Sequence, residues 1–138
     1  MAKSREAYVD TSALIALIDR SDSYHALFKQ LFVDPPKLVT TVLVLAEGHG
    51  WFLRRYDQTR ALQYLSMIEE MRPLTVLDVG AKQHEAAVAV LRKFSDQKLT
   101  LVDAVGLRVM ADRRIKSCWS TDFHMGLTGV PLVIHSRD

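Results

Sequence analysis

Short apolar segments that alternate with longer amphipathic ones constrain the fold of this chain more than any other feature. Residues 7–9, 37–40, 74–77 and 115–120 are apolar or β-branched and have the length of buried strands. Buried strands that alternate with helices favour a mainly parallel sheet with helices on both faces. The sequence therefore predicts an α/β fold, a three-layer α/β/α sandwich with a short, mainly parallel sheet.

Apolar residues at helical spacing fill the segments between these strands. We expect helices over residues 11–19, from 21 or 22 to the Pro35–Pro36 pair, and over 42–56, 58–71, 80–93 and 101–111. The side chains expected to cap the first, third and sixth helices are Thr11 or Ser12, Thr40 or Thr41, and Thr100. Residues 132–134 are expected to form a last strand at the edge of the sheet.

The size and composition of the chain indicate one globular domain, residues 1–138. Cys118 is the one cysteine, so no internal disulfide can form, and its apolar neighbours predict a small buried side chain. The apolar stretch 13–18 is too short to span a bilayer, and Asp10 interrupts a signal-peptide pattern. We therefore expect no membrane association and a cytoplasmic location.

The charge of the chain does not identify its partner. The net charge is only +2, but lysines and arginines gather at 54–55, 92–93 and 113–116. Such clusters are compatible with a nucleic-acid partner. They are more often solvated helix ends, so this alternative stays open.

Two acidic residues follow predicted strands. Asp10 comes directly after the first strand, and Asp122 comes just after the fourth. Ligands of open parallel sheets bind at the carboxyl ends of the strands, which makes both residues candidates for a functional site. Each also has a structural alternative, since Asp10 could cap the following helix and Asp122 could begin a turn.

Two further acids lie on predicted helices. Glu47 carries the only charge in residues 41–52, and a lone carboxylate on an apolar helix needs a partner or solvent. Asp103 follows Thr100 at the spacing of a capping box, which gives it a purely structural alternative. It also shares a helical stripe with Gly106, so it faces either solvent or a polar cavity.

Taken together, the four acids suggest a cation site. If the fold brings them within about 5 Å, each pair repels by roughly 3 kcal/mol at an effective dielectric near 20. Either some of them stay protonated or a cation neutralises them. Oxygen-only ligands select Mg²⁺ or Mn²⁺, which can activate water and stabilise the leaving oxygen in phosphodiester hydrolysis.

Four segments of the chain resemble the four motifs of the PIN-domain nucleases. The residues that carry the resemblance are 8–14 (YVDTSAL), 41–47, 99–104 (LTLVDA) and 120–123 (STDF). They occur in the family's order and span nearly the whole chain, whose length is similar to that of the VapC-type toxins. The first and third motifs are fairly specific, and all four acidic positions are filled.

The resemblance implies a PIN-like sandwich that holds one or two Mg²⁺ or Mn²⁺ ions. Asp10, Glu47 and Asp103 would be the principal ligands, and Asp122 would bind directly or through water. It also implies an endoribonuclease that hydrolyses RNA with a metal-activated water, as the toxin of a type II toxin–antitoxin pair. Its expected partners are RNA, a small antitoxin inserted near the site, and a second copy in a homodimer.

Other residues receive supporting roles. Ser12 and Ser120 match polar positions that orient carboxylates or waters, and Arg54, Arg55 and Lys98 are candidates for binding RNA. The two histidines beside proposed ligands, His49 and His124, are more often bystanders than substrate contacts. The run Gly48-His49-Gly50 is unusual inside a helix, and either loosens the helix or lets a partner approach closely.

Three other functions are alternatives to the nuclease. A PIN-like scaffold that binds RNA or protein without cutting is the main alternative, although the four filled acidic positions argue against it. A phosphoacceptor receiver domain needs an acidic pair after the first strand, where only Asp10 stands. A dehalogenase-type phosphatase needs a second Asp at the position of Ser12.

Overall fold

The computed structural model describes residues 5–135, and within them the chain forms a sheet of four parallel strands. The strands are β1 (Glu6–Val9), β2 (Lys37–Thr41), β3 (Leu74–Leu77) and β4 (Cys118–Trp119). Their order in the sheet is β3-β2-β1-β4. The first strand therefore lies inside the sheet, between the second strand and the last one.

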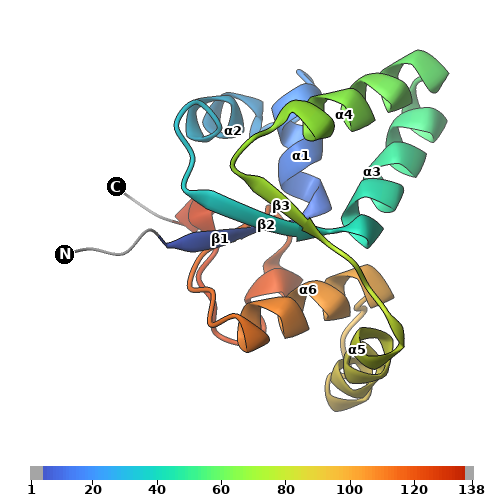
Figure 1. The fold of residues 1–138 in the computed structure, drawn as a ribbon, viewed down its shortest axis with the longest axis vertical. Helices are drawn as coiled ribbons and strands as arrows, with labels where there is room; N and C mark the ends of the chain where they lie inside the picture. The colour runs from blue at the N-terminus through green and yellow to red at the C-terminus, as the bar shows by residue number, and fades with distance from the viewer. Residues whose placement is uncertain (1–4, 136–138) are drawn as a thin grey trace.

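Six helices cover the two faces of this sheet. They are α1 (Thr11–Ile18), α2 (His25–Leu31), α3 (Val42–Arg55), α4 (Gln58–Glu70), α5 (Ala81–Lys93) and α6 (Leu101–Asp112). Figure 1 shows α1 to α4 on one face and α5 and α6 on the other, so the predicted α/β/α sandwich with a parallel sheet is confirmed. Within residues 5–135, no helix has the length and apolar character needed to cross a membrane.

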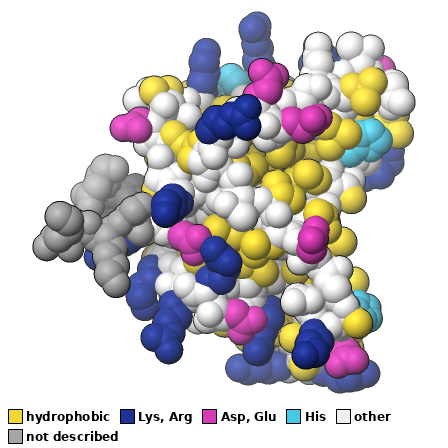
Figure 2. All heavy atoms as spheres, viewed as in Figure 1, with side chains coloured by type: hydrophobic (Ala, Val, Ile, Leu, Met, Phe, Trp, Pro, Cys, Tyr) yellow, Lys and Arg dark blue, Asp and Glu magenta, His cyan; other side chains and the backbone are white. Residues whose placement is uncertain are grey.

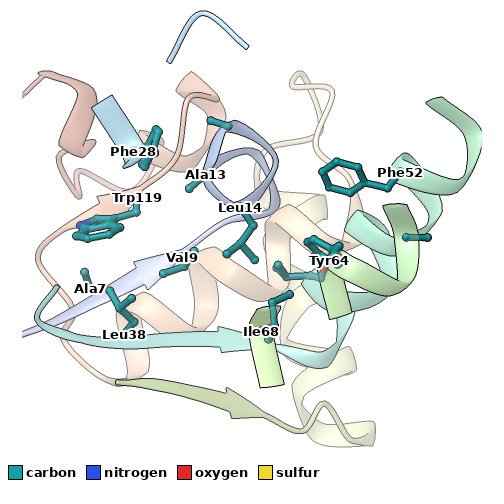
Figure 3. Packing of buried hydrophobic residues seen from close by; sticks show 13 residues of the cluster. Ala7, Val9, Ala13, Leu14, Phe28, Leu38, Phe52, Tyr64, Ile68 and Trp119 are labelled. Carbon is teal, nitrogen blue, oxygen red and sulfur yellow. Dashed lines mark hydrogen bonds between the residues drawn. The ribbon is translucent and has the colours of Figure 1, made fainter. Parts of the chain in front are cut away.

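The alternation of side chains along β1 divides the core into two layers. Ala7 and Val9 point toward α1 to α4, where they join a cluster that contains Leu14 and Phe28 (Figure 3). Tyr8 points to the opposite face and packs in a cluster with residues of α6 and of the C-terminal part of the chain. Cys118 is buried in this second cluster as an unpaired thiol, as predicted.

The last part of the sheet is shorter than the sequence pattern predicts. The strand expected over 115–120 pairs with β1 only at Cys118 and Trp119. It starts late because Arg114 has a positive φ of 55° and the Ile115 N–H still donates to the Met110 carbonyl of α6. This backbone turn and this hydrogen bond keep residues 114 and 115 out of the sheet.

The prediction of an edge strand over residues 132–134 is wrong. Leu132 makes a single bridge to Cys118, and Val133–His135 then form a 3₁₀ helix. A run of three apolar residues fits either structure, because so short a segment carries no periodicity.

Several predicted helix starts also differ from the structure. The second helix begins at His25 instead of Ser21 or Asp22, because the Asp22 carboxylate accepts a hydrogen bond from the Tyr24 N–H and holds a turn there. Asp10 occupies the N-cap position of α1, and neither Thr11 nor Ser12 provides a side-chain cap.

Of the side-chain caps predicted for the third and sixth helices, only the one on the sixth helix forms. Thr41 occupies the N-cap position of α3 but makes no side-chain cap bond. Thr100 does cap α6, and it does so in the predicted capping box with Asp103.

The glycine run in α3 does not interrupt the helix. Gly48 is buried, and a Cβ at this position would overlap the phenol ring of Tyr64 in α4. The Tyr64 hydroxyl donates a hydrogen bond of 2.8 Å to the Val44 carbonyl. The group that approaches Gly48 closely is thus the neighbouring helix of the same chain.

Candidate functional site

A pocket of about 310 Å³ opens at the end of the sheet where the strands finish. All four acids singled out from the sequence line it, together with hydroxyl, aromatic and basic side chains: Asp10, Thr11, Ser12, Ile15, Glu47, Trp51, Arg54, Thr100, Asp103 and Asp122. They come from the ends of β1 and β4 and from α1, α3 and α6. Figure 2 shows the surface hollowed on this side, between the lobe that contains α3 and α4 and the lobe that contains α5.

Asp10 is the most buried of the four acids, with 4% of its surface exposed. Its Oδ2 accepts hydrogen bonds of 2.9 Å from both Ser12 Oγ and Ser120 Oγ. Burial, together with the nearby charges of Asp103 and Glu47, raises the pKa of Asp10 to about 6, against the lowering effect of the two hydroxyls. The structure thus holds a carboxylate at a place that penalises its charge.

Ser120 and Ser12 connect the ends of β1 and β4. Besides their bonds to Asp10, the Ser12 hydroxyl accepts from the Thr121 N–H and the Ser120 hydroxyl accepts from the Asp122 N–H, both at 3.0 Å. The two hydroxyl oxygens lie 3.1 Å apart. This network fixes the orientation of Asp10 and the path of the loop that carries Asp122.

Glu47 lies on the face of α3 that lines the pocket and is half-buried. Burial raises its pKa, the nearby Thr11 hydroxyl partly offsets that effect, and the charges of Asp103 and Asp122 raise it again. The Thr11 hydroxyl is itself buried and makes no other hydrogen bond with the described residues. The alternative of a glutamate that faces bulk solvent therefore does not hold.

Asp103 combines the two roles considered for it. Its Oδ2 accepts from the Thr100 N–H at 3.2 Å, and its own N–H donates to Thr100 Oγ1 at 3.1 Å. It is nevertheless buried at the pocket wall, with 8% of its surface exposed. The capping box uses one carboxylate oxygen and sets the direction of the other.

Asp122 also begins a turn, as its alternative predicts. Its Oδ1 accepts from the His124 N–H at 3.0 Å and from His124 Nδ1 at 2.8 Å, at the start of the 3₁₀ helix Phe123–Gly126. The next residue, Phe123, is 65% exposed and was not among the sequence candidates. The sequence places this phenylalanine at the end of the fourth motif, but no local pattern predicts its exposure.

The three basic candidates take different positions. Arg54 lines the pocket, and its positive charge opposes the rise in the pKa of Glu47. Arg55 lies instead beside the Tyr56 ring, 5.8 Å from its centroid. Lys98 is exposed between α5 and α6 and does not line the pocket.

The four carboxylates share a pocket without forming a finished cation site. Among residues 5–135, no three acidic, histidine or cysteine side chains lie close enough together to hold a metal ion. Asp10, Asp103 and Asp122 each use a single oxygen in the hydrogen bonds described above. The second oxygen of each remains available to another ligand.

Comparison with known proteins identifies the family of this fold and this pocket. The family model for the PIN domain matches residues 7–125. The structure is similar to that of the Mycobacterium tuberculosis toxin VapC20, described as a Sarcin-Ricin loop cleaving toxin, with 25% identity, a TM-score of 0.83, and coverage of 91% of this chain and 96% of that one. A toxin–antitoxin complex from Klebsiella pneumoniae has the same fold, at 22% identity, a TM-score of 0.61, and coverage of 92% and 95%.

A curated protein of different name is also similar. Ribosomal RNA small subunit methyltransferase G of Lactiplantibacillus plantarum is 28% identical over 123 residues, which cover 89% of this chain. This chain spans about half of that protein, 47% of its length. Since the PIN family model covers most of the sequence and the VapC20 structure matches it over nearly its full length, this chain belongs to the PIN domain family.

Proposed function

We propose that this chain is an endoribonuclease that hydrolyses RNA phosphodiester bonds with the help of one or two divalent cations, Mg²⁺ or Mn²⁺. The proposal is carried by one observation, the pocket at which Asp10, Glu47, Asp103 and Asp122 meet. Among the described residues that line it, Arg54 supplies the one positive charge. A bound cation would remove the repulsion that such a set of carboxylates otherwise bears.

The donor set fits a hard divalent cation. It consists of carboxylate oxygens, the ligands that Mg²⁺ and Mn²⁺ prefer. The carboxylate of Asp10 is anchored through Oδ2 by two hydroxyls, so its Oδ1 is free to act as a ligand. Binding would require the carboxylates to converge further, because the structure brings no three of the described candidates within ligand distance.

The roles of the side chains follow from their positions. A bound cation would supply an activated water and offset the charge on the leaving oxygen. Ser12 and Ser120 would keep Asp10 oriented, and Thr100 would do the same for Asp103. Arg54 would bind a phosphate of the substrate at the rim of the pocket, with Arg55 and Lys98 farther along the path of the RNA.

RNA is the substrate class that the comparisons favour. VapC20 is described as cleaving the Sarcin-Ricin loop, and the curated relative is named for ribosomal RNA. The reaction in the second name, methyl transfer, gives no role to four carboxylates in one pocket, whereas phosphodiester hydrolysis does. An oligoribonucleotide of the Sarcin-Ricin loop is therefore the first substrate to test.

The biological setting that we propose is a toxin–antitoxin pair. Two structures of this fold are described as a toxin and as a toxin–antitoxin complex. By extension, this chain would act in the cytoplasm as a single domain over residues 1–138, form a homodimer, and be inhibited by a small antitoxin that binds near the pocket.

A cleavage assay tests the proposed activity. The chain is incubated with the Sarcin-Ricin loop oligonucleotide and with mixed RNAs in Mg²⁺, in Mn²⁺ and in EDTA. We expect cleavage with either cation, none in EDTA, and none by Asp10→Asn. Asp34→Asn is the matched control, since Asp34 is exposed and lies outside the pocket.

The possible results separate the alternatives. RNA that is bound but never cut would favour the non-cutting PIN-like scaffold. Cleavage that persists in EDTA, or full activity of Asp10→Asn, would contradict the metal-site assignment.

A further inference from the structure

Phe123 is an aromatic ring turned toward solvent beside a polar pocket. With 65% of its surface exposed, it is the most exposed of the described aromatic residues. It directly follows Asp122, which lines the acidic pocket. Packing in the core does not explain its position, because the hydrophobic clusters of the described residues do not include Phe123.

One face of the Phe123 ring packs against a neighbouring side chain. It stacks on the ring of His124, with centroids 4.1 Å apart and an interplanar angle of 28°. His124 Nδ1–H donates to Asp122 Oδ1 at 2.8 Å, so the imidazole cannot rotate freely. Met125, the following residue, is fully buried and anchors the 3₁₀ helix in the core.

This arrangement suits a nucleobase. A flat, exposed ring that is already ordered loses little entropy on binding, and bases stack on aromatic side chains in single-stranded nucleic acids. The two rings directly follow Asp122, an acid of the pocket proposed for phosphodiester hydrolysis, so they would be neighbours of a base adjacent to the reacting phosphate. Arg54 lines the same pocket and supplies a positive charge for the backbone of the same strand.

We propose that Phe123, backed by His124, is a stacking subsite for the base of a nucleotide next to the bond that is cut. This inference rests on the proposed ribonuclease function and adds a substrate contact to it. Phe123 acts by holding an unpaired base, so it selects RNA loops and single strands over continuous duplex. It contributes to substrate binding, while the carboxylates carry the chemistry.

Loss of the ring should weaken RNA binding more than turnover. Base–aromatic stacking corresponds to a change in Kd of roughly 5- to 150-fold. We expect Phe123→Ala to raise Kd and KM for a Sarcin-Ricin loop oligonucleotide within that range and to leave kcat close to the wild-type value. Phe123→Trp should restore binding, while Phe123→Leu, which keeps apolar surface without a π face, should not.

A fluorescent base makes the stacking directly visible. Oligonucleotides that carry 2-aminopurine at successive loop positions are bound in Ca²⁺ instead of Mg²⁺, and stacking on an aromatic ring quenches their emission. At one position, we expect quenching with the wild type and Phe123→Trp that is lost with Phe123→Ala. Tyr24→Ala, at a partly exposed tyrosine (36%) outside the pocket, is the matched aromatic control. Thermal melting establishes that each variant is folded.

The outcomes separate the stacking subsite from the ribonuclease function. If the wild type binds and cuts RNA but Phe123→Ala binds with unchanged Kd and quenching, the subsite is wrong and the ribonuclease stands. If the wild type binds no RNA, both are wrong. If Phe123→Ala leaves RNA binding intact but changes the oligomeric state in sedimentation, the ring is a protein contact and the subsite is overturned.

Discussion

Gly48 and Gly50 lie two residues apart on α3 but have very different neighbours. A Cβ at Gly48 would overlap the ring and hydroxyl of Tyr64, which is fully buried between α3 and α4. A Cβ at Gly50 would meet only the flexible end of Arg54, with Nη1 at 3.0 Å. The two glycines therefore allow the same substitution to be compared in a packed and in an open environment of one helix.

The expected cost of Gly48→Ala has two parts. Overpacking costs roughly 1–3 kcal/mol, and displacement of Tyr64 would break the hydrogen bond to the Val44 carbonyl, worth about 1 kcal/mol. The higher helix propensity of alanine offsets up to about 1 kcal/mol. The net loss in the free energy of unfolding is roughly 1–3 kcal/mol, whereas Gly50→Ala should be neutral or stabilising by up to about 1 kcal/mol.

Denaturant and thermal unfolding measure this difference. For a chain of this length, 1 kcal/mol corresponds to roughly 3–4 °C in Tm, so Gly48→Ala should melt roughly 3–12 °C below the wild type. Because Glu47 precedes Gly48, the same variant should also lose ribonuclease activity through a shift of the pocket wall. A Gly48→Ala protein as stable as Gly50→Ala would refute the close packing of α3 on Tyr64.

Three further predictions concern charge. Asp10→Asn should raise the free energy of unfolding of the metal-free protein by up to roughly 3 kcal/mol. It removes a buried carboxylate that Asp103 and Glu47 repel and whose pKa is about 6, against an ordinary 3.8. An unchanged Tm would contradict this. Mg²⁺ or Mn²⁺ at about 100 times its Kd should stabilise the wild type by about 2.7 kcal/mol and Asp10→Asn by much less, as calorimetry can measure. The hydrogen bond and charge of Arg113 lower the pKa of Glu6, so their stabilisation is present above the ordinary pKa of 4.5 and is lost as the pH falls below it. Glu6→Gln should therefore lower the free energy of unfolding by less than about 1 kcal/mol at pH 7 and not at all near pH 3. A difference that grows toward acid pH would exclude this pair as its source.

The sequence predicts the long elements of this fold well and its short ones poorly. The six helices have enough residues to express a period, so their positions, apart from their exact ends, follow from the pattern. β4 has two residues, and its extent is decided by contacts with β1. The 132–134 segment becomes a 3₁₀ helix for the same reason, since only its packing distinguishes it from a strand.

Some features of the candidate site can likewise be predicted from the sequence, and others cannot. That Asp10 and Asp122 lie at one end of the sheet follows from their positions after strands, and the capping box of Asp103 follows from local spacing. That Glu47 faces the same pocket requires the angle of α3, which no local pattern contains. The separation of Arg54 from Arg55, and the exposure of Phe123, are likewise results of tertiary packing.

The register of two strands explains how the folded chain holds the buried carboxylate of Asp10 at the acidic pocket. Val9 pairs with Trp119, so the residues that follow them, Asp10 and Ser120, leave the sheet side by side. The Ser120 hydroxyl then donates to a carboxylate that burial would otherwise expel, and Ser12 donates to the same oxygen from the first turn of α1. Both hydroxyls bind Oδ2, so the stabilisation leaves Oδ1 available. The hydrogen bonds that make Asp10 tolerable in the folded chain thus also orient its remaining oxygen as a ligand, and stability and proposed function depend on the same two serines.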